Sequence, residues 1–217
     1  VHIGIGFSMS FEPSAAVFSS IEEVVRDAAE GKVFVLLDDE ERENEGDLVA
    51  LADRVSPEAI NMMIRNGSGI VCLAFSEYHA KKLGLGLMSR RNANDGCPAF
   101  TESIDARHGI TTGVSAGDRA ATILKAVSDG SSADDIVTPG HVFPIVANPG
   151  GVLKRGGHTE AGVDIAKLAG AAHAAVICEL MNPDGTMARL PEIMEFASTN
   201  GIKVATIKKL REYLSSS

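Results

Sequence analysis

An acidic stretch in the first quarter of the chain has the residue types of a cation site. The segment LDDEERENEGD, residues 37–47, has seven carboxylates among its last ten residues, together with one arginine and one glycine. Carboxylate oxygens on irregular backbone can bind Mg²⁺ or Mn²⁺, and Arg42 can either hold an anionic substrate or keep the carboxylates apart. Charge runs are more often solvated surface. This segment alone therefore leaves two interpretations open, an exposed turn and part of a metal site.

A second segment, KRGGHTE at residues 154–160, has the composition of an anion site. Its two glycines let backbone N–H groups approach a ligand closely, and the helix expected after them presents its positive end. Lys154, Arg155 and Thr159 supply donors suited to phosphate, and His158 can bind a metal or transfer a proton. A glycine-rich connection that carries an exposed histidine explains the same pattern equally well.

Two further residues are candidates for proton transfer. His141 follows a Pro-Gly pair in TPGHVFP, and Glu179 comes near the end of the apolar segment AVICEL. An acid at the end of an apolar strand either caps the strand in water or has its ionisation changed by burial. By pattern alone a structural role is the more common one for each residue, and geometry decides between the two roles.

Net charge and cysteine content limit the classes to which the sequence can belong. The formal net charge is −9 over 217 residues, which disfavours a broad attraction to nucleic acid or to an anionic membrane. Cys72, Cys97 and Cys178 form no C-x-x-C pair, which disfavours a disulfide framework and structural zinc. No apolar run reaches membrane-spanning length, and no signal peptide is recognised. We therefore expect a cytoplasmic protein with neither nucleic acid nor a membrane as partner.

Helical and strand patterns alternate along the chain and must position these residues. Caps, apolar periodicity and glycine stops predict helices over the following ranges: 19–31, 56–67, 115–130, 159–170, 191–201 and the C-terminus. Apolar or alternating runs predict strands over the following ranges: 32–37, 47–53, 69–75, 99–106, 141–147, 174–180 and 203–207. Strand 47–53 follows strand 32–37 with no helix between them, which favours a mixed, partly antiparallel sheet over a doubly wound parallel one.

No internal repeat or linker divides the chain, so we expect one catalytic domain over residues 1–217 with strands covered by helices. Residues 1–18 read as an irregular N-terminal segment. Residues 84–98 lack periodicity and are rich in Gly, Asn and Ser. Structureless loops of this length in a compact domain are usually lids or disordered segments, so we interpret 84–98 as a mobile active-site loop.

Seven segments occur in one order along the chain: LDDEERENEGD, GSGIVC, TTGVSAGDR, PGHVFP, RGGHTEA, ICEL and DGTMAR. This ordered set resembles the 3,4-dihydroxy-2-butanone 4-phosphate synthase family of riboflavin biosynthesis, from about residue 20 to residue 214. The resemblance implies a single-domain, three-layer α+β fold with a mixed β-sheet covered by helices. It also implies a homodimer whose active sites lie near the subunit interface.

The reaction implied by the resemblance is the conversion of D-ribulose 5-phosphate to 3,4-dihydroxy-2-butanone 4-phosphate and formate. It is a lyase reaction that proceeds by enolisation, rearrangement of the carbon skeleton and loss of one carbon. The implied cofactor is Mg²⁺, or Mn²⁺ in its place. An open, oxygen-rich site made by one carboxylate and one imidazole suits these ions better than a closed thiolate site suits zinc.

Site residues are carried over from the resemblance position by position. Glu43 and His158 match the family's metal ligands, and His141 and Glu179 match its acid–base pair. The matches to its substrate contacts are Arg42, Glu43, Asp47, Thr112, Arg155, Gly156, Gly157, His158, Thr159 and Glu179. The second choices, which flank the site or the phosphate end, are Asp38, Glu45, Cys72, Asp118 and Arg119.

Three alternatives remain beside this interpretation. One is another divalent-metal sugar-phosphate isomerase or lyase that stops at the enediol. The second, from a different class, is a nucleotide- or RNA-binding module of related fold, which the negative net charge disfavours. The third is a catalytically silent acidic scaffold, which the presence of all the candidate metal and acid–base positions disfavours.

Overall fold

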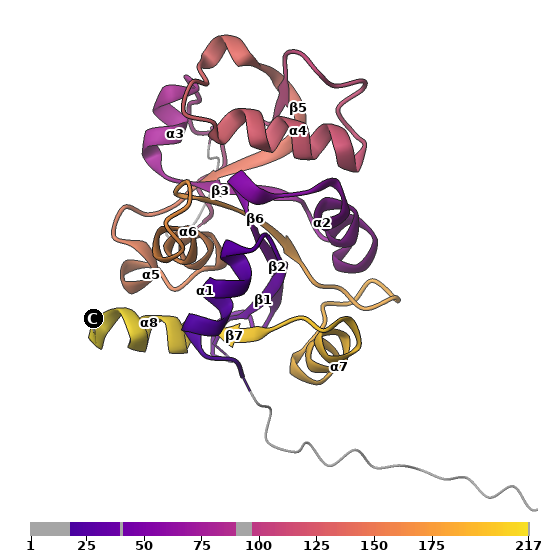
Figure 1. The fold of residues 1–217 in the computed structure, drawn as a ribbon, viewed down its shortest axis with the longest axis vertical. Coiled ribbons are helices and arrows are strands. Elements are labelled where there is room, and N and C mark those ends of the chain that lie inside the picture. Colours follow the sequence, from indigo (N-terminus) through magenta and orange to yellow (C-terminus); the bar gives the residue numbers. More distant parts are fainter. Residues whose placement is uncertain (1–17, 40, 90–96, 217) are drawn as a thin grey trace, which may run out of the picture.

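The computed structural model describes residues 18–39, 41–89 and 97–216. Residues 1–17, which make up nearly all of the predicted irregular N-terminal segment 1–18, lie outside the described residues. So do residues 90–96, the middle of the predicted mobile loop 84–98. In the described part, seven strands form one sheet in the order β4-β5-β3-β6-β2-β1-β7, with helices on both of its faces (Figure 1).

The elements follow the alternation expected from the sequence. The strands are β1 Phe34–Leu37, β2 Gly46–Leu51, β3 Cys72–Phe75, β4 Ile104–Ala106, β5 Ile136–Val146, β6 Ala174–Glu179 and β7 Val204–Thr206. The α-helices are α1 Ile21–Ala29, α2 Pro57–Met62, α3 Glu77–Lys82, α4 Ala116–Val127, α5 Gly151–Lys154, α6 His158–Leu168, α7 Leu190–Asn200 and α8 Ile207–Ser216. The shorter helical turns are η1 Ala52–Arg54, η2 Met63–Gly67 and η3 Ala133–Asp135.

The sheet is mixed, as the short connection between its first two strands predicts. β1 pairs with β2 in antiparallel register, with Phe34 opposite Val49. β6 is antiparallel to both of its neighbours, β2 and β3, whereas β3 and β5 are parallel. A doubly wound parallel sheet is therefore excluded, because an antiparallel hairpin lies near its centre.

Alternate side chains of the central strands supply two separate cores. Leu36 and Val49 point to the face covered by α1, α5, α6 and α8, while Val35 and Leu48 point to the face covered by α2, α4 and α7. This period of two along each strand explains why the strands are apolar throughout, since both faces of the sheet are buried. The predicted three-layer α+β fold with a mixed sheet is confirmed.

Local signals at helix ends are confirmed, whereas several strand bounds differ from those predicted: segment 99–106 is mostly outside β4, and β5 begins at Ile136 rather than at residue 141. Ser20 and Glu23 form a reciprocal capping box on α1, and Ser56 caps α2 with Pro57 in its first turn. Segment 99–106 was predicted to be a strand, but only its last three residues belong to β4. Phe100 makes only an isolated bridge, to Ile145, so the alternation there reflects half-burial beside β5 rather than a continuous ladder.

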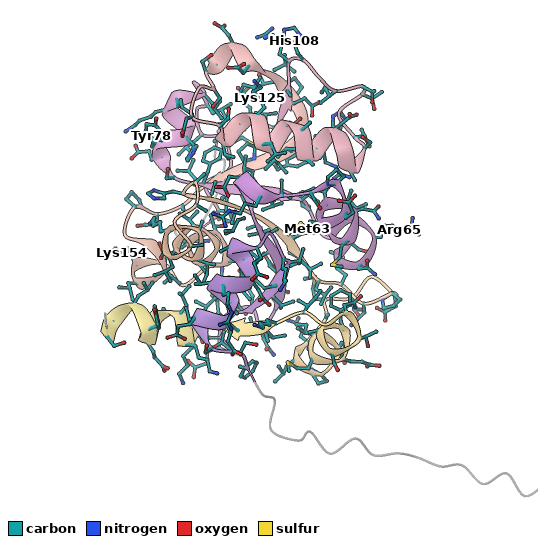
Figure 2. The ribbon with its side chains drawn as sticks, viewed as in Figure 1. Met63, Arg65, Tyr78, His108, Lys125 and Lys154 are labelled. Carbon is teal, nitrogen blue, oxygen red and sulfur yellow. The ribbon has the colours of Figure 1, made fainter. Side chains whose placement is uncertain are left out.

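The molecular surface carries most of the charge. Arg65, Lys125 and Lys154 are exposed at separate places on the surface, whereas Met63 is buried in the core (Figure 2). Among the helices of the described residues, none has both the length and the apolar composition needed to cross a bilayer.

Candidate active site

The acidic stretch forms the connection between β1 and β2, and a buried carboxylate organises it. The Asp38 side chain is fully buried and accepts hydrogen bonds from the backbone N–H of Glu45 (2.9 Å) and of Glu43 (3.3 Å). Arg42 Nη1 donates to Asp38 Oδ2 at 2.6 Å and to Glu43 Oε2 at 2.7 Å. Arg42 therefore lies between two carboxylates and separates their charges, which is one of the two uses expected for it.

A second arginine, which the sequence analysis missed, holds this connection from the other side. Arg189, the residue before α7, donates through Nη1 to the carbonyl oxygens of Glu43 (2.7 Å) and Asn44 (2.6 Å). The same atom lies 3.6 Å from Glu45 Oε1. Asn44 has a φ of 52°, so the chain turns in the left-handed region here. Arg189 ends the quoted segment DGTMAR, but its partners lie about 145 residues away in the sequence.

His158 meets the acidic connection at the first residue of α6. Its ring is buried, its Nδ1 lies 3.7 Å from Asp47 Oδ1, and its Nε2 has no hydrogen-bond partner among the described residues. One ligand atom from each of Asp38, Glu43 and His158 lies within 4.8 Å of the others. A buried imidazole nitrogen without a hydrogen-bond partner among the described residues, beside two carboxylates, fits the donor set of a divalent cation.

In the glycine-rich turn that leads into α6, the side chain of Arg155 points back toward the first turn of that helix. Arg155 Nη1 donates to Glu160 Oε2 at 2.6 Å, and Glu160 Oε1 accepts the backbone N–H of Asn148. A Cβ on Gly157 would meet the guanidinium of Arg155, so a larger residue there would have to displace the Arg155 side chain from Glu160. Gly156 is half-buried, whereas Gly157 and Thr159 are buried. The predicted substrate segment 155–159 therefore leads into α6, which begins at His158.

Two predicted acids lie side by side on the sheet next to this group. Asp47 of β2 is paired with Glu179 of β6. Side chains alternate along a strand, and the residues two positions away, Val49 and Ile177, lie in the core under α6, so both acids are on that face of the sheet. Glu179 Oε2 accepts the backbone N–H of Ile70 at 2.8 Å. Burial raises the pKa of Asp47 to about 7, opposed by His158, while neighbouring carboxylates, Glu179 foremost, raise it further.

Cys72 lies on the same face of the sheet as these acids, at the start of β3. Burial raises the pKa of its thiol strongly, with further contributions from Glu179 and Asp47. A raised pKa disfavours the thiolate, which is the form that acts as a nucleophile or metal ligand. Cys72 therefore acts as a small core residue, as its position in an apolar strand indicates.

His141 belongs to a second group of polar side chains, formed with an aspartate that the sequence analysis missed. Its backbone N–H donates to Asp105 Oδ1 (3.0 Å), and its ring Nδ1 lies 2.8 Å from Asp105 Oδ2. The His141 side chain is 45% exposed and that of Asp105 only 10%. A carboxylate at Nδ1 leaves Nε2 as the accessible ring nitrogen. In the sequence the only signal for Asp105 is an acid within the strand pattern of segment 99–106.

The two groups are separated within one chain. β3 and β6 lie between β5, which carries His141, and β2, and three strand spacings amount to about 14 Å. His141 and Glu179 lie on strands separated by β3, about 10 Å apart at the same spacing. Thr112 is exposed in the loop that contacts His141 through Gly113. The structure thus groups Glu43, Asp47, His158 and Glu179 together, and places His141 with Thr112.

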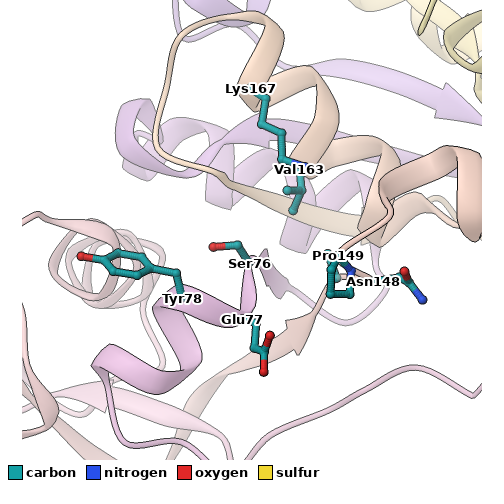
Figure 3. A pocket seen from close by; sticks show the side chains of 8 residues that line it. Ser76, Glu77, Tyr78, Asn148, Pro149, Val163 and Lys167 are labelled. Atoms are coloured by element: carbon teal, nitrogen blue, oxygen red, sulfur yellow. The ribbon is translucent and has the colours of Figure 1, made fainter. Parts of the chain in front are cut away.

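Neither of two surface cavities contains these groups. One, of about 220 Å³, lies where β3 and β5 end, with Ser76, Glu77 and Tyr78 on one side and Val163 and Lys167 of α6 on the other (Figure 3). In the register of β3 and β6, Phe75 pairs with Ala174 and Cys72 with Ile177, so this cavity is at the opposite end of β6 from Glu179. The other, of about 450 Å³, lies beside η2 and α7. The chemistry of the side chains, rather than the cavities, therefore locates the candidate site.

The fold and the site define an α+β protein with a candidate divalent-cation centre at the end of a mixed sheet. The model of one family, described as 3,4-dihydroxy-2-butanone 4-phosphate synthase, matches residues 22–213. The chain belongs to this family of enzymes, as the order of its motifs indicated.

Individual relatives agree with this assignment. A 3,4-dihydroxy-2-butanone 4-phosphate synthase of Neisseria meningitidis is 53% identical over 197 residues, which cover 91% of this chain and 54% of the relative. Riboflavin biosynthesis protein RibBA of Aquifex aeolicus is 50% identical, over 90% of this chain and 49% of the relative. The chain thus spans about half the length of these curated relatives.

A solved structure of similar length supports the fold and carries a metal. It is a 3,4-dihydroxy-2-butanone 4-phosphate synthase in complex with two magnesium ions, 36% identical to this chain, with a TM-score of 0.87. The alignment covers 92% of this chain and 98% of that one. Magnesium therefore occurs in a relative of the same fold, and the described residues of this chain contain a group of side chains that could hold a metal ion.

Proposed function

We propose that this protein converts D-ribulose 5-phosphate to 3,4-dihydroxy-2-butanone 4-phosphate and formate, in riboflavin biosynthesis, with Mg²⁺ as cofactor and Mn²⁺ as an effective substitute. The observation that carries the proposal is the grouping of Glu43 and Asp38 with the unpartnered buried Nε2 of His158, in a chain of this family. The proposal treats the chain as one catalytic domain of a cytoplasmic enzyme.

Glu43 and His158 are the proposed metal ligands. A bound divalent cation supplies Lewis-acid stabilisation of negative charge on adjacent sugar oxygens. Asp38 fixes the β1–β2 connection through its bonds to backbone N–H groups and to Arg42, so that the Glu43 carboxylate faces His158 before ligand arrives. This arrangement limits the reorganisation on binding to the contact between Glu43 and Arg42, which a cation would replace.

Substrate binding is assigned to the residues around this centre. Asp47 and Glu179 offer carboxylate oxygens to sugar hydroxyls from the face of the sheet. The phosphate is assigned to the positive end of α6 at residues 155–159 together with Arg42, and to Thr112 of a second copy of the chain, since Thr112 lies with His141. Interactions with the phosphate are remote from the reacting carbons and hold a flexible sugar in one orientation.

His141 and Glu179 are the proposed acid–base residues. Asp105 fixes the His141 ring through Nδ1, so that Nε2 accepts or donates the proton. About 14 Å of sheet separates the His141 strand from that of Asp47, too far for direct proton transfer in one chain. We therefore assign the active form to a homodimer in which His141 of each copy faces the metal centre of the other. The exposed Ile70 and Phe143, 53% and 39% accessible, give apolar surface beside His141 for such a contact.

Formate release tests this proposal. The protein is incubated with D-ribulose 5-phosphate and Mg²⁺, with and without a chelator, and formate is measured over time. We expect formate and the four-carbon phosphate in equal amounts, no product with chelator, and recovery when Mg²⁺ or Mn²⁺ is added back. An isomerised pentose phosphate without formate identifies the isomerase alternative, and an unchanged substrate in the presence of bound Mg²⁺ contradicts both.

A further inference from the structure

The loop between β4 and α4 contacts the hydrogen-bonded edge of the His141–Asp105 pair. Gly113 in this loop has a φ of 90°, a conformation that favours glycine. A Cβ at this position would lie 2.6 Å from His141 Nδ1 and would overlap Asp105 Oδ2. The backbone of Gly113 is therefore packed directly against the two atoms whose contact fixes the histidine ring.

Asp118, at the start of α4, holds Gly113 in this place. Its Oδ2 accepts the N–H of Gly113 at 3.1 Å and the hydroxyl of Thr111 at 2.7 Å. Its Oδ1 accepts the backbone N–H of Thr111 at 3.1 Å. The hydrogen bonds from Thr111, followed by that from Gly113, lower the pKa of Asp118 to about 2. Both carboxylate oxygens of Asp118 thus accept hydrogen bonds from its own loop. The resemblance implied a role at the phosphate end for this residue.

The helix that carries Asp118 is itself fixed to the strand that carries Asp105. Ser115 caps α4 by accepting the N–H of Asp118. One turn further along, the Thr122 hydroxyl accepts the N–H of Ala106, the residue after Asp105, at 2.9 Å. The helix that carries Asp118 is therefore hydrogen-bonded to β4, the strand that carries Asp105. The loop and the His141–Asp105 pair that it contacts are held by the same two elements.

We propose that Asp118 and Gly113 are positioning residues for His141. Asp118 fixes the position of Gly113, and Gly113 closes the space beside the pair, so that the half-exposed ring keeps the rotamer in which Nδ1 faces Asp105. The inference deepens the proposed function, on which it rests for its effect on turnover. Neither residue contacts the reacting atoms, and the histidine that they position is assigned to proton transfer, so we expect the larger effect on the rate constant. A ring displaced by about 1 Å can lose about 10²-fold in rate.

Gly113→Ala is the direct test, and Gly109→Ala is its matched control. Gly109 lies in the same loop with a φ of 81°, but an added Cβ would have no atom within 4 Å. Both variants therefore introduce similar backbone strain, and only one introduces a clash with the pair. We expect Gly113→Ala to lower kcat by about 10²-fold at nearly constant KM, and Gly109→Ala to leave both close to the wild-type values.

A spectroscopic measurement separates this inference from the proposed function. In the wild type, the proton shared by His141 Nδ1 and Asp105 should give a downfield proton signal in nuclear magnetic resonance, assigned by its loss in His141→Gln. We expect this signal to move or broaden in Gly113→Ala and to persist in Gly109→Ala, whether or not the enzyme releases formate. Absence of formate from a wild type with this signal contradicts the proposed function only.

Asp118→Asn provides a second variant with a milder change. An asparagine keeps one carbonyl oxygen but cannot accept all three hydrogen bonds, so the loop loosens without a clash. We expect the signal of the His141 proton to broaden and kcat to fall, by less than in Gly113→Ala. An unchanged signal in both folded variants, or a change of KM without a change of kcat, overturns the positioning role. If Gly113→Ala does not fold, Asp118→Asn decides the question.

Discussion

At the scale of single residues, the candidate metal centre depends on how one buried charge is compensated. Asp38 is fully buried, and such a carboxylate is costly unless donors surround it. It receives two backbone N–H groups and one guanidinium nitrogen, all from residues 42–45. Within the described residues, this compensation leaves the Glu43 side chain, which is 51% exposed, paired with Arg42, a contact that a cation can replace.

The first prediction concerns the two proposed ligands. Glu43→Gln removes the negative charge of one proposed ligand and His158→Ala removes the nitrogen of the other, so we expect each to weaken Mg²⁺ binding by about tenfold or more, or at least 1.4 kcal/mol, in isothermal titration calorimetry. Glu41→Gln is the control, because it removes the same charge from an exposed acid of the same connection that is not part of the group. Equal weakening by Glu41→Gln would mean that overall charge, rather than ligation, attracts the ion.

The residue types of the site were predictable, but its supporting residues were not. Glu43 and His158 stand in motifs with a local pattern, and the structure brings them together. Asp105 and Arg189 have no such pattern. Asp105 acts on a histidine 36 residues away, and Arg189 acts on carbonyl groups about 145 residues away. Hydrogen bonds between distant segments leave no periodicity in the sequence, so only the fold shows them.

At the scale of elements, α6 determines where His158 lies. The helix packs on the centre of the sheet with Gly162, one turn after His158, at the point of closest approach. A Cβ on Gly162 would lie 3.0 Å from Ala175 Cβ, 3.5 Å from Ile177 Cγ2 and 3.7 Å from Val49 Cγ1. The absence of a side chain at this position lets the helix lie close enough for the His158 ring to be buried beside the acidic connection.

The second prediction follows from this close packing. Gly162→Leu places four carbon atoms where no space exists, so we expect a loss of about 1–3 kcal/mol in the free energy of unfolding and weaker Mg²⁺ binding, because the start of α6 is displaced. Urea denaturation and calorimetry measure the two effects. Gly162→Leu with unchanged stability and unchanged Mg²⁺ affinity would show that α6 does not depend on this contact.

A size exchange provides the control for that prediction. Gly162→Ala alone should gain less stability than the helix propensity of alanine, about 0.8–1 kcal/mol over glycine, would give, because its methyl group lies 3.0 Å from Ala175 Cβ. Combining it with Ala175→Gly removes the nearest atom, so the double variant should be more stable than the sum of the two single changes predicts. Strict additivity in this double-mutant cycle would indicate that the two positions do not press on each other.

Element boundaries were predicted best where a side chain caps a helix. Ser20, Ser56 and Ser115 each accept the N–H expected from their spacing. The prediction was poorest around residues 99–103, where alternating apolar and polar residues lie beside β5 without joining the ladder of β4. Alternation reports on which side chains are buried, and a half-buried extended segment has the same alternation as a strand.

At the scale of the whole molecule, the order of strands decides which groups can act together. β1 and β2 come first in the sequence and lie on one side of β6, whereas β3, β5 and β4 lie on its other side. This order puts His141 and the group around His158 on different parts of one sheet. Sequence patterns give the elements but not their order, because the order depends on contacts between segments distant along the chain. The proposed dimer is the arrangement that reunites the two groups.

Global stability should depend on pH through a histidine far from the candidate site. His79 in α3 is buried, with its Nδ1 3.1 Å from the Ser76 hydroxyl. Burial lowers its pKa to about 4, helped by Lys82 and His173 and opposed by Asp129. In the unfolded chain a histidine titrates near its usual pKa of about 6.5. Between these two values the unfolded state binds more protons than the folded state.

The third prediction follows from this difference in proton binding. Stability rises with pH wherever the unfolded state binds more protons than the folded state. The contribution of His79 to the free energy of unfolding is therefore complete above pH 6.5, and it decreases as the pH falls from 6.5 towards 4. His79→Gln cannot be protonated, so its stability should fall less than that of the wild type between pH 7 and pH 5, as measured by urea denaturation at each pH. His108→Gln, at an exposed position (Figure 2), should follow the wild type. Parallel pH curves for the wild type and His79→Gln would mean that His79 titrates normally in the folded protein, and that the acid sensitivity of the fold comes from its carboxylates.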